Sequence, residues 1–505
     1  MCGIAGVWFP KEVENTEIDP TDVVVKMTAG QQHRGHEGAG AVTARHGEKG
    51  KFFEHKGLGL VYDVFTPDVI ERLNGHCGIT HNRYSTTGGT SITNIQPLSG
   101  IMDDGENAEA VFVGHNGNLT NELKGIRPGT SDTWCIIHNF GAVNGGREIH
   151  RRIFQALKNV KGAFSLVFLF QDKNGKNSLI CVRDPQGFWP LWLAKYKFKA
   201  GGTVRTGYLA ASETCAFDMI EGARVWRPVK PGEIVVINED GVKSFKPKAW
   251  RGQKLARCIF ELIYFSHPSS LVETADFREN PVYVWEIQQA LGRRLAIENS
   301  DLQADFVEGI PDSSNLHALG FSHQIRILPD IAILRRHAVG RTFISPEGKE
   351  GTGAKKASRG TLVLRKFATL IKKFLQASVA IICDDSLVRG ETTRKVIGFI
   401  KSQVKKAKRN LKIIIAIMSP PVKFPCFLGI NTSTKKELAW NKFGGSVENV
   451  RKAIKADDLR YLTIAGLFET AESLTGHGRE KWCSACFTGD YPVQIERKEY
   501  LKELN

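Results

Sequence analysis

The stretch VAIICDDSLVRGETT (residues 379–393) contains a short apolar run, two adjacent acids, a loop with a glycine, and two threonines. The apolar run predicts a buried strand. Segment 392–410 predicts a helix because its apolar side chains recur three and four residues apart. Segment LKIIIAIM (411–418) predicts a second buried strand. Strand, helix and strand in this order are typical of a βαβ unit in a parallel sheet, so this half of the chain is predicted to be α/β.

The loop in this stretch has the chemistry of a phosphate site. A turn at a helix N-terminus presents free backbone N–H groups to an anion, and the hydroxyls of Thr392 and Thr393 add donors. Asp384 and Asp385 do not suit a phosphate, but they suit the hydroxyls of an attached ribose or a Mg²⁺ ion. The site follows a parallel strand, where ligands bind in open α/β sheets. In the alternative interpretation, the acids only cap a helix.

The chain begins MCGIAGVW (residues 1–8), with a cysteine directly after the initiator methionine. The apolar run is short and has no basic residues before it, so we do not interpret it as a targeting segment. Aminopeptidases remove methionine when the second residue is small, which would give Cys2 a free α-amine beside its thiol. An α-amine has a pKa of about 8 and can serve as the base for the thiol, as in N-terminal nucleophile enzymes. The alternative is a buried structural cysteine.

The length of the chain, 505 residues, predicts two or more domains. Helical spacing appears from about residue 281, in VYVWEIQQALGRRLAIE (282–298), and we place the boundary near residue 250. Short β-like runs broken by glycine dominate the first half, which predicts a sheet-dominated α+β layer structure. These runs are GLGLVYDVF (57–65), CGITHNRYST (77–86), AVFVGHNGNL (110–119), AFSLVFLF (163–170), SLICVRDP (178–185) and EIVVI (233–237).

The composition, 42% hydrophobic and 24% charged residues, is that of an ordinary globular protein. No apolar stretch reaches the roughly 18 residues that span a bilayer, so a cytoplasmic protein without membrane contact is predicted. The net charge of +16 indicates nucleic acid or anionic small molecules as candidate partners. The basic run KSQVKKAKRNLK (401–412) is interpreted as the solvated face of a helix, and it contains no aromatics for base stacking. Nucleic acid is therefore a less favoured partner.

The order of further motifs along the chain indicates a family resemblance. Cys2 with HNRYST (81–86), GHNGNLTNE (114–122) and GTSDT (129–133) resembles a class II glutamine amidotransferase domain. The stretch 379–393 resembles the phosphoribosyl-pyrophosphate loop of type I phosphoribosyltransferases. Together the two halves resemble the amidophosphoribosyltransferase family. Supporting marks are QHRGHEGAG (32–40), VRDPQGFWPL (182–191), ASETCAFD (211–218), CIFELIYFSHPSS (258–270), GIPDSS (309–314) and FPCFLGI (424–430).

The resemblance implies an α+β N-terminal nucleophile (Ntn) hydrolase sandwich over residues 2–250, followed by an α/β phosphoribosyltransferase domain over 251–470. Residues 471–505 would form a C-terminal tail. The implied reaction converts phosphoribosyl pyrophosphate, glutamine and water to 5-phosphoribosylamine, glutamate and pyrophosphate, in the first step of de novo purine biosynthesis. The resemblance also implies a homo-oligomer, a tetramer in the family.

Family roles carry over to residues of the amidotransferase half. Cys2 would attack the glutamine amide and form a thioester. The side chain of Asn116 and the backbone N–H of Gly117 would form the oxyanion hole. Arg83 would bind the substrate carboxylate through two parallel bonds, and Asp132 would pair with the substrate ammonium.

The phosphoribosyltransferase half carries a second set of implied roles. Ser314, Asp384 and Asp385 would hold Mg²⁺ and the ribose, and Arg341 would begin the loop that closes over pyrophosphate. Ammonia released from glutamine would pass through an internal channel to this site. The residues implied in binding phosphoribosyl pyrophosphate are Asp384, Asp385, Ser386, Val388, Arg389, Gly390, Thr392 and Arg341.

Four of the ten cysteines stand in motifs of the family's iron–sulfur subclass: Cys258, Cys426, Cys483 and Cys486. The last two have the C-x-x-C spacing that chelates one metal ion or cluster. The resemblance implies a [4Fe–4S] cluster with a structural role, and zinc or free thiols are the alternatives. The other cysteines, such as Cys77, Cys135, Cys181, Cys215 and Cys383, are interpreted as core residues.

Several positions depart from the family pattern. Trp189 and His267 stand where the family has arginine, Arg335 replaces a lysine, and Glu391 replaces a small hydroxyl residue beside the phosphate loop. Two competing functions therefore stay open. One is a divergent relative that keeps glutaminase activity but transfers ammonia weakly or to another acceptor. The other is a non-catalytic regulatory or nucleic-acid-binding protein on the same scaffold.

Overall fold

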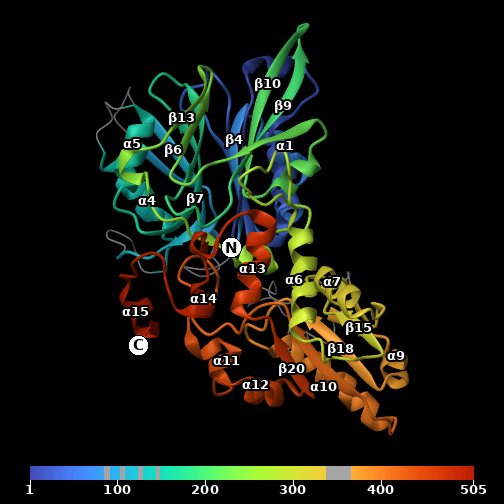
Figure 1. Ribbon diagram of the computed structural model, residues 1–505. Coiled ribbons are helices and arrows are strands. Elements are labelled where there is room, and N and C mark those ends of the chain that lie inside the picture. Colours follow the sequence, from blue (N-terminus) through green and yellow to red (C-terminus); the bar gives the residue numbers. More distant parts are fainter. Residues whose placement is uncertain (85–90, 103–108, 123–128, 144–147, 337–365, 505) are drawn as a thin grey trace, which may run out of the picture.

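The computed structural model describes residues 1–84, 91–102, 109–122, 129–143, 148–336 and 366–504. The first half of the chain forms one lobe and the second half forms another below it in the view of Figure 1. Within these ranges, no helix is long and apolar enough to cross a membrane.

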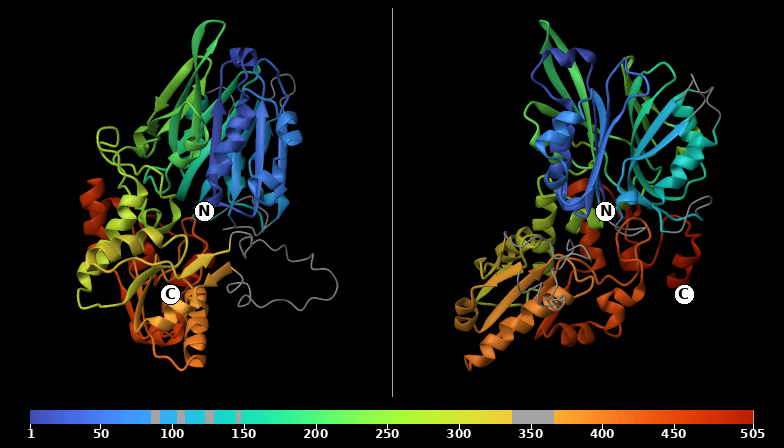
Figure 2. Two further views of the ribbon diagram at one scale, coloured as in Figure 1. Left: turned by 90° about the vertical axis from the view of Figure 1, so that its right-hand side faces the viewer. Right: turned by 180° about the vertical axis from the view of Figure 1, so that it is seen from behind.

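Two antiparallel sheets face each other in the first lobe (Figure 2). One has the order β11-β9-β10-β1-β4-β2-β3 and the other β13-β12-β8-β7-β6-β5. The first comprises β1 (Gly3–Trp8), β2 (Gly38–Ala44), β3 (Phe53–Leu58), β4 (Cys77–Arg83), β9 (Trp192–Ala200), β10 (Thr203–Ala211) and β11 (Ala223–Pro228). The second comprises β5 (Leu98–Met102), β6 (Glu109–Leu119), β7 (Gly162–Gln171), β8 (Asn177–Arg183), β12 (Ile234–Asn238) and β13 (Gly241–Phe245).

Helices cover the outer faces of both sheets. Helix α1 (Pro20–Gly30) packs on the first sheet, while α4 (Thr133–Gly141) and α5 (Ile149–Leu157) pack on the second. Side chains alternate between the two faces of each strand, so one set fills the core between the sheets and the other meets the helices. The layers are helix, sheet, sheet and helix, which confirms the predicted α+β sandwich.

The strand predicted for GLGLVYDVF (57–65) is wrong over most of its length. Strand β3 ends at Leu58, and residues Val61–Val64 form helix α2. Val61, Val64 and Phe65 have the spacing of one helix face, and all three are buried in one cluster with Ala39 and Ala41 of β2. The segment is apolar as expected, but its buried residues recur three and four positions apart, which is the spacing of a helix and not of a strand.

The second lobe contains the predicted parallel sheet, in the order β15-β18-β19-β20. Its strands are β15 (Phe306–Gly309), β18 (Val379–Asp384), β19 (Lys412–Ile417) and β20 (Asp458–Tyr461). One face is covered by α9 (Ile371–Gln376), α10 (Glu391–Lys406) and α12 (Val447–Ile454). The other is covered by α6 (Val284–Glu298), α7 (Asn315–Ile325) and α13 (Ile464–Thr475). The βαβ unit β18-α10-β19 is confirmed.

Helix α10 shows why its basic run leaves the fold undisturbed. Val396, Ile397, Ile400 and Val404 are buried against the sheet, while Lys405 and Lys406 are exposed. The run therefore belongs to a solvated helix face, as predicted.

The two lobes share a hydrophobic core and are joined near the C-terminus. Met1, Phe188 and Trp189 of the first lobe pack in one cluster with residues of α6, α7 and α13. Strand β14 (Arg257–Cys258) pairs in parallel with β21 (Trp482–Cys483), and α14 (Ala485–Thr488) follows. The chain ends in α15 (Lys498–Leu504), which lies beside the lower end of the first lobe in Figure 1.

Candidate active sites and cysteine cluster

Cys2 directly precedes β1, and it is buried with 7% of its surface exposed. Its Sγ lies 3.5 Å from both the backbone oxygen and the backbone nitrogen of Tyr84. The Cys2 carbonyl accepts a hydrogen bond of 3.2 Å from Nε of Arg34. The next residue is held as well, since Gly3 N donates to Oδ1 of Asn82 at 2.6 Å. The peptide group between Cys2 and Gly3 is therefore anchored at both its carbonyl and its N–H.

Asn116 and Gly117 lie near the end of β6, on the sheet that faces β1. Gly114 of the same strand lies against Ile4 of β1, which brings this part of β6 beside the start of the chain. The Asn116 side chain is completely buried, and among the described residues neither its Oδ1 nor its Nδ2 has a hydrogen-bond partner. An unpaired buried amide is costly, so this group is free to serve a ligand.

Only glycine fits at position 117. A Cβ there would lie 2.0 Å from the carbonyl oxygen of Ala163 and 2.6 Å from Nε2 of His115. The backbone of Gly117 is thus packed closely against β7.

Arg83 and Asp132 are both buried, one at the end of strand β4 and the other at the start of helix α4. Arg83 is the last residue of β4, beside β1, and its Nη1 donates to the Asn94 carbonyl at 2.9 Å. Asp132 precedes α4, and its Oδ2 accepts a bond of 2.8 Å from Leu119 N at the end of β6. The structure therefore places Cys2 next to Arg83, and Asp132 next to the strand that carries Asn116.

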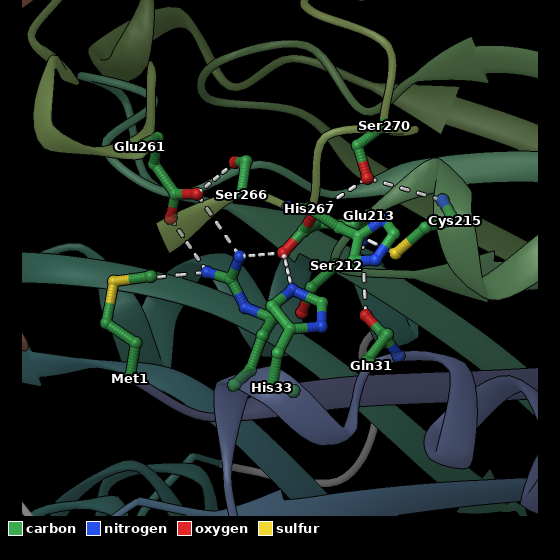
Figure 3. A network of polar contacts seen from close by, with 12 residues as sticks. Met1, Gln31, His33, Ser212, Glu213, Cys215, Glu261, Ser266, His267 and Ser270 are labelled. Atoms are coloured by element: carbon green, nitrogen blue, oxygen red, sulfur yellow. Dashed lines mark hydrogen bonds and ion pairs between the residues drawn. The ribbon is translucent and has the colours of Figure 1, made fainter. Parts of the chain in front are cut away.

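A buried network around Arg34 joins the two lobes (Figure 3). Arg34 Nη1 pairs with Glu213 of the first lobe, and Nη2 pairs with Oε1 of Glu261 in the second at 2.7 Å. Glu213 also accepts bonds from Ser270 Oγ and His267 N, both at 2.7 Å. Although burial alone would raise it, His33 and Arg34 hold the pKa of Glu213 well below its usual range.

Sequence reasoning missed this network. Arg34, Glu213 and Glu261 all stand inside motifs that carried the resemblance, and a charged residue within a motif was the available signal. The His33 ring, the Glu213 carboxylate and Cys215 Sγ lie within 4.8 Å of one another. Because Glu213 is committed to Arg34, we interpret this group as structural. Through its bond to the Cys2 carbonyl, Arg34 ties the position of Cys2 to the contact between the lobes.

The two adjacent acids lie buried at the carboxyl end of β18, as predicted. Ser314 Oγ lies 3.2 Å from Oδ1 of Asp384 and 3.4 Å from Oδ2 of Asp385. Thr393 Oγ1 donates to Oδ2 of Asp384 at 2.9 Å. Burial, followed by the charge of Asp385, raises the pKa of Asp384 to about 8, and burial also raises the pKa of Asp385. Such a pair is stabilised by a bound cation.

The loop after the acids turns at Gly390, whose φ of 69° favours glycine, and α10 begins at Glu391. The Arg389 side chain is directed to Glu437, with which it forms an ion pair, and it donates to the Asn431 carbonyl at 2.8 Å. Thr392 is half-buried in the first turn of α10. Arg341 lies outside the described residues. The backbone of this loop, rather than the Arg389 guanidinium, is positioned for an anion.

Four cysteines from distant parts of the chain line one small cavity: Cys258, Cys426, Cys483 and Cys486. The parallel pairing of β14 with β21 sets Cys258 directly beside Cys483. Phe188, Trp189, Leu428 and Tyr491 are among the other lining residues. The predicted grouping of these cysteines is therefore present in the fold.

Burial in this cavity favours neutral thiols over thiolates. Burial, with the neighbouring cysteines as a further cause, raises the pKa of Cys258 and Cys486 well above the usual value. Burial also raises the pKa of Cys426, although the backbone amides of Leu428, Ile430 and Gly429 act to lower it. Leu428 N lies 3.5 Å from the Cys426 sulfur. A positively charged metal centre would offset the burial of thiolates.

The known proteins to which the chain is similar in sequence are amidophosphoribosyltransferases. Over 98% of its length it is 34% identical to "Amidophosphoribosyltransferase 1, chloroplastic" of Arabidopsis thaliana, covering 79% of that protein. It is 32% identical to the amidophosphoribosyltransferase of Bacillus subtilis, over 100% of this chain and 96% of that one. The mouse amidophosphoribosyltransferase is 33% identical, with 98% of both chains covered.

The chain belongs to the amidophosphoribosyltransferase family. Solved structures agree: glutamine phosphoribosylpyrophosphate amidotransferase from B. subtilis, complexed with ADP and GMP, superposes with a TM-score of 0.79 at 31% identity over 98% of both chains. A structure described as the allosteric regulatory enzyme of purine biosynthesis superposes with a TM-score of 0.80 at 31% identity, over 99% of both chains. No protein-family model matches the sequence.

The predicted fold and enzyme class are thereby confirmed. The protein is an amidophosphoribosyltransferase-family enzyme of the first step of purine biosynthesis, with an Ntn amidotransferase half followed by a phosphoribosyltransferase half.

Three of the positions that depart from the family pattern have defined surroundings in this chain. Trp189 is buried, its Nε1 donates to the Leu428 carbonyl at 2.9 Å, and its ring lines the cysteine cavity. His267 donates its backbone N–H to Glu213 and has its ring centre 5.3 Å from that of His33. Arg335 pairs with Asp312. Trp189 and His267 thus lie where the lobes meet.

Proposed function

We propose that this chain forms 5-phosphoribosylamine from phosphoribosyl pyrophosphate and glutamine, using Cys2 in one half and the acid pair in the other. One observation supports this most directly. A single chain holds a buried Asn116 amide, which has no partner among the described residues, close to the start of β1, which Cys2 directly precedes, and a buried acid pair beside a helix N-terminus. The first arrangement suits acyl transfer, and the second suits a phosphorylated ribose.

In the glutamine half, Cys2 sulfur attacks the amide carbon, and the nitrogen leaves as ammonia with the proton taken from the thiol as the thioester forms. Water then hydrolyses the thioester, which releases glutamate and frees Cys2. Asn116 Nδ2 and Gly117 N–H stabilise the oxygen as it becomes negative. Arg83 binds the glutamine carboxylate and Asp132 binds its ammonium. The α-amine of Cys2, free once Met1 is removed, takes the thiol proton. In the unprocessed chain, burial lowers the pKa of the Met1 amine to about 5, so burial at this end of the chain favours an unprotonated amine.

In the transferase half, Asp384, Asp385 and Ser314 hold Mg²⁺ and the ribose hydroxyls. When bound, Mg²⁺ neutralises charge on the two carboxylates and on the pyrophosphate. The backbone from Ser386 to Thr392, including Val388, Arg389 and Gly390, binds the 5′-phosphate, and Arg341 contacts pyrophosphate. Ammonia from the first half attacks the ribose carbon, and pyrophosphate leaves.

The four-cysteine cavity holds a [4Fe–4S] cluster in this proposal. A tetrahedral zinc ion, with Zn–S bonds of about 2.3 Å, would hold its sulfur atoms about 3.8 Å apart. Among the described residues, no three of the four sulfur atoms lie within 4.8 Å of one another. Wider spacing suits a cluster of several atoms better than one ion. Its role is structural, since it fastens residues 471–505 to both halves.

Protein prepared without oxygen is expected to be brown and to contain about four irons per chain, as a four-thiolate cluster implies. Exposure to oxygen should bleach it and lower the melting temperature, because the cluster closes loops of well over a hundred residues. Cys483→Ser should lower the iron content measured by elemental analysis.

The matched control is Cys77→Ala, which removes a buried thiol that does not line the cavity. It should keep its iron. Colourless anaerobic protein with one zinc per chain would contradict the cluster but not the site. Metal-free protein with four titratable thiols would contradict both.

The proposed function is tested by one assay that follows glutamate and pyrophosphate together. With glutamine, phosphoribosyl pyrophosphate and Mg²⁺ all present, the two products should appear in equal amounts. Glutamate without pyrophosphate would favour the divergent glutaminase. Neither product, with salt-dependent binding of RNA instead, would favour the non-catalytic alternative. A cytoplasmic location and a homotetramer stay predictions.

A further inference from the structure

We propose that Tyr500, in the C-terminal helix α15, is a positioning residue of the glutamine site and acts through Asn118. This proposal rests on the proposed function of Asn116, Gly117 and Asp132. The observation behind it is that the end of the chain returns to the strand that carries the oxyanion residues.

Asn118 directly follows Gly117 and is 3% exposed. Its Nδ2 donates to the Tyr500 hydroxyl at 2.9 Å and to the Phe427 carbonyl at 2.7 Å. Both acceptors come from segments more than three hundred positions away along the chain. The amide of Asn118 is therefore held from the C-terminal side, immediately beside the proposed oxyanion hole.

The Tyr500 side chain is itself well fixed. It is buried, and its ring stacks on that of Phe427, with centroids 4.6 Å apart and planes 20° from parallel. The Arg497 guanidinium lies over the Tyr500 ring, 4.6 Å from its centroid. A side chain held by stacking presents its hydroxyl in one place, which is what a positioning residue requires.

The preceding tail residues hold the backbone that follows Asn118. Glu496 N and Arg497 N donate to the Thr120 carbonyl at 2.9 and 3.1 Å, and Thr120 Oγ1 donates to the Gln494 carbonyl at 2.8 Å. These contacts bracket Leu119, whose N–H donates to Asp132. The tail thus supports the strand end between the oxyanion residues and the carboxylate that would bind the glutamine ammonium.

The test is Tyr500→Phe, which keeps the ring on Phe427 and removes only the hydroxyl. Loss of one buried hydrogen bond should raise KM for glutamine about fivefold in the glutamate-release assay. Ammonia-dependent transfer should be unchanged. Tyr500→Leu, which also removes the stacking, should have a larger effect, and its glutamine KM should respond while its KM for phosphoribosyl pyrophosphate does not.

Tyr208→Phe is the matched control. Tyr208 lies in β10 of the first lobe, is partly buried, and has its ring centre 6.2 Å from that of Trp226 rather than meeting Asn118. Its glutamine KM should equal that of the parent. The proposal is overturned if Tyr500→Phe leaves the glutamine KM unchanged, or if it lowers ammonia-dependent transfer equally.

Direct binding separates this proposal from the proposed function. In a Cys2→Ala background, calorimetry should show glutamine binding, weakened about fivefold by Tyr500→Phe. Binding that is equal in both proteins overturns the role of Tyr500 and leaves the glutamine site standing. A parent protein that binds no glutamine overturns both.

Discussion

Cys2→Ala is expected to abolish glutamine-dependent formation of phosphoribosylamine while ammonia-dependent formation continues. The two half-reactions use separate sites, and only the first needs the thiol. Removing a covalent nucleophile should lower the glutaminase rate on the order of a thousandfold or more. Alanine is also small, so removal of Met1 should proceed as before. The measurement is the rate of glutamate release, compared with pyrophosphate release driven by ammonium salts.

Cys181→Ala supplies the control for this experiment. Cys181 is a buried cysteine of β8 in the same lobe, and burial raises the pKa of its thiol to about 12. This variant should lose some stability through the cavity it creates, but it should keep glutaminase activity. Continued glutamate release by Cys2→Ala would refute the nucleophile assignment.

Replacing Asp384 and Asp385 together by asparagine is expected to remove Mg²⁺-dependent binding of phosphoribosyl pyrophosphate. Asparagine keeps the shape of aspartate but not the charge that a divalent cation requires. From the energies of charged hydrogen bonds, we expect the affinity for phosphoribosyl pyrophosphate with Mg²⁺ to fall about a hundredfold. Glutamate release by Cys2 should be spared. Calorimetric titration with phosphoribosyl pyrophosphate and Mg²⁺ provides the measurement.

The same variant should not be destabilised, because the parent loses stability when its buried acid pair ionises. The folded-state pKa of Asp384 is raised to about 8, so the folded protein binds the proton more tightly than the unfolded chain. Without a cation, ionisation therefore costs stability progressively as the pH rises from about 4 to 8. The neutral pair avoids this cost, so its melting temperature at pH 8 should equal or exceed that of the parent.

Asp301→Asn is the surface control for the acid pair. Its carboxylate is 61% exposed and pairs with Arg460 in the same lobe. Binding should be unaffected by this change. Unchanged affinity in the Asp384 and Asp385 variant would remove the ribose and metal role from these residues.

The sequence was informative wherever the chemistry is local. The apolar run, the two acids and Gly390 all lie within one stretch, and the structure forms the strand, loop and helix that this order predicts. Ser314 could be linked to this stretch only through the family motif. The error at 57–65 arose because an apolar run of that length satisfies strand and helix patterns alike.

The amino-acid sequence by itself determined the strand, loop and helix of residues 379–410, the place of Cys2 at the chain start, and the close pair Cys483 and Cys486. Only the tertiary structure decided which distant segments meet. The register of β14 on β21 brings Cys258 to Cys483, Arg34 links Glu213 to Glu261, and Tyr500 reaches Asn118. Local patterns depend on neighbours a few residues apart, whereas these contacts depend on how sheets and lobes pack after long loops have closed.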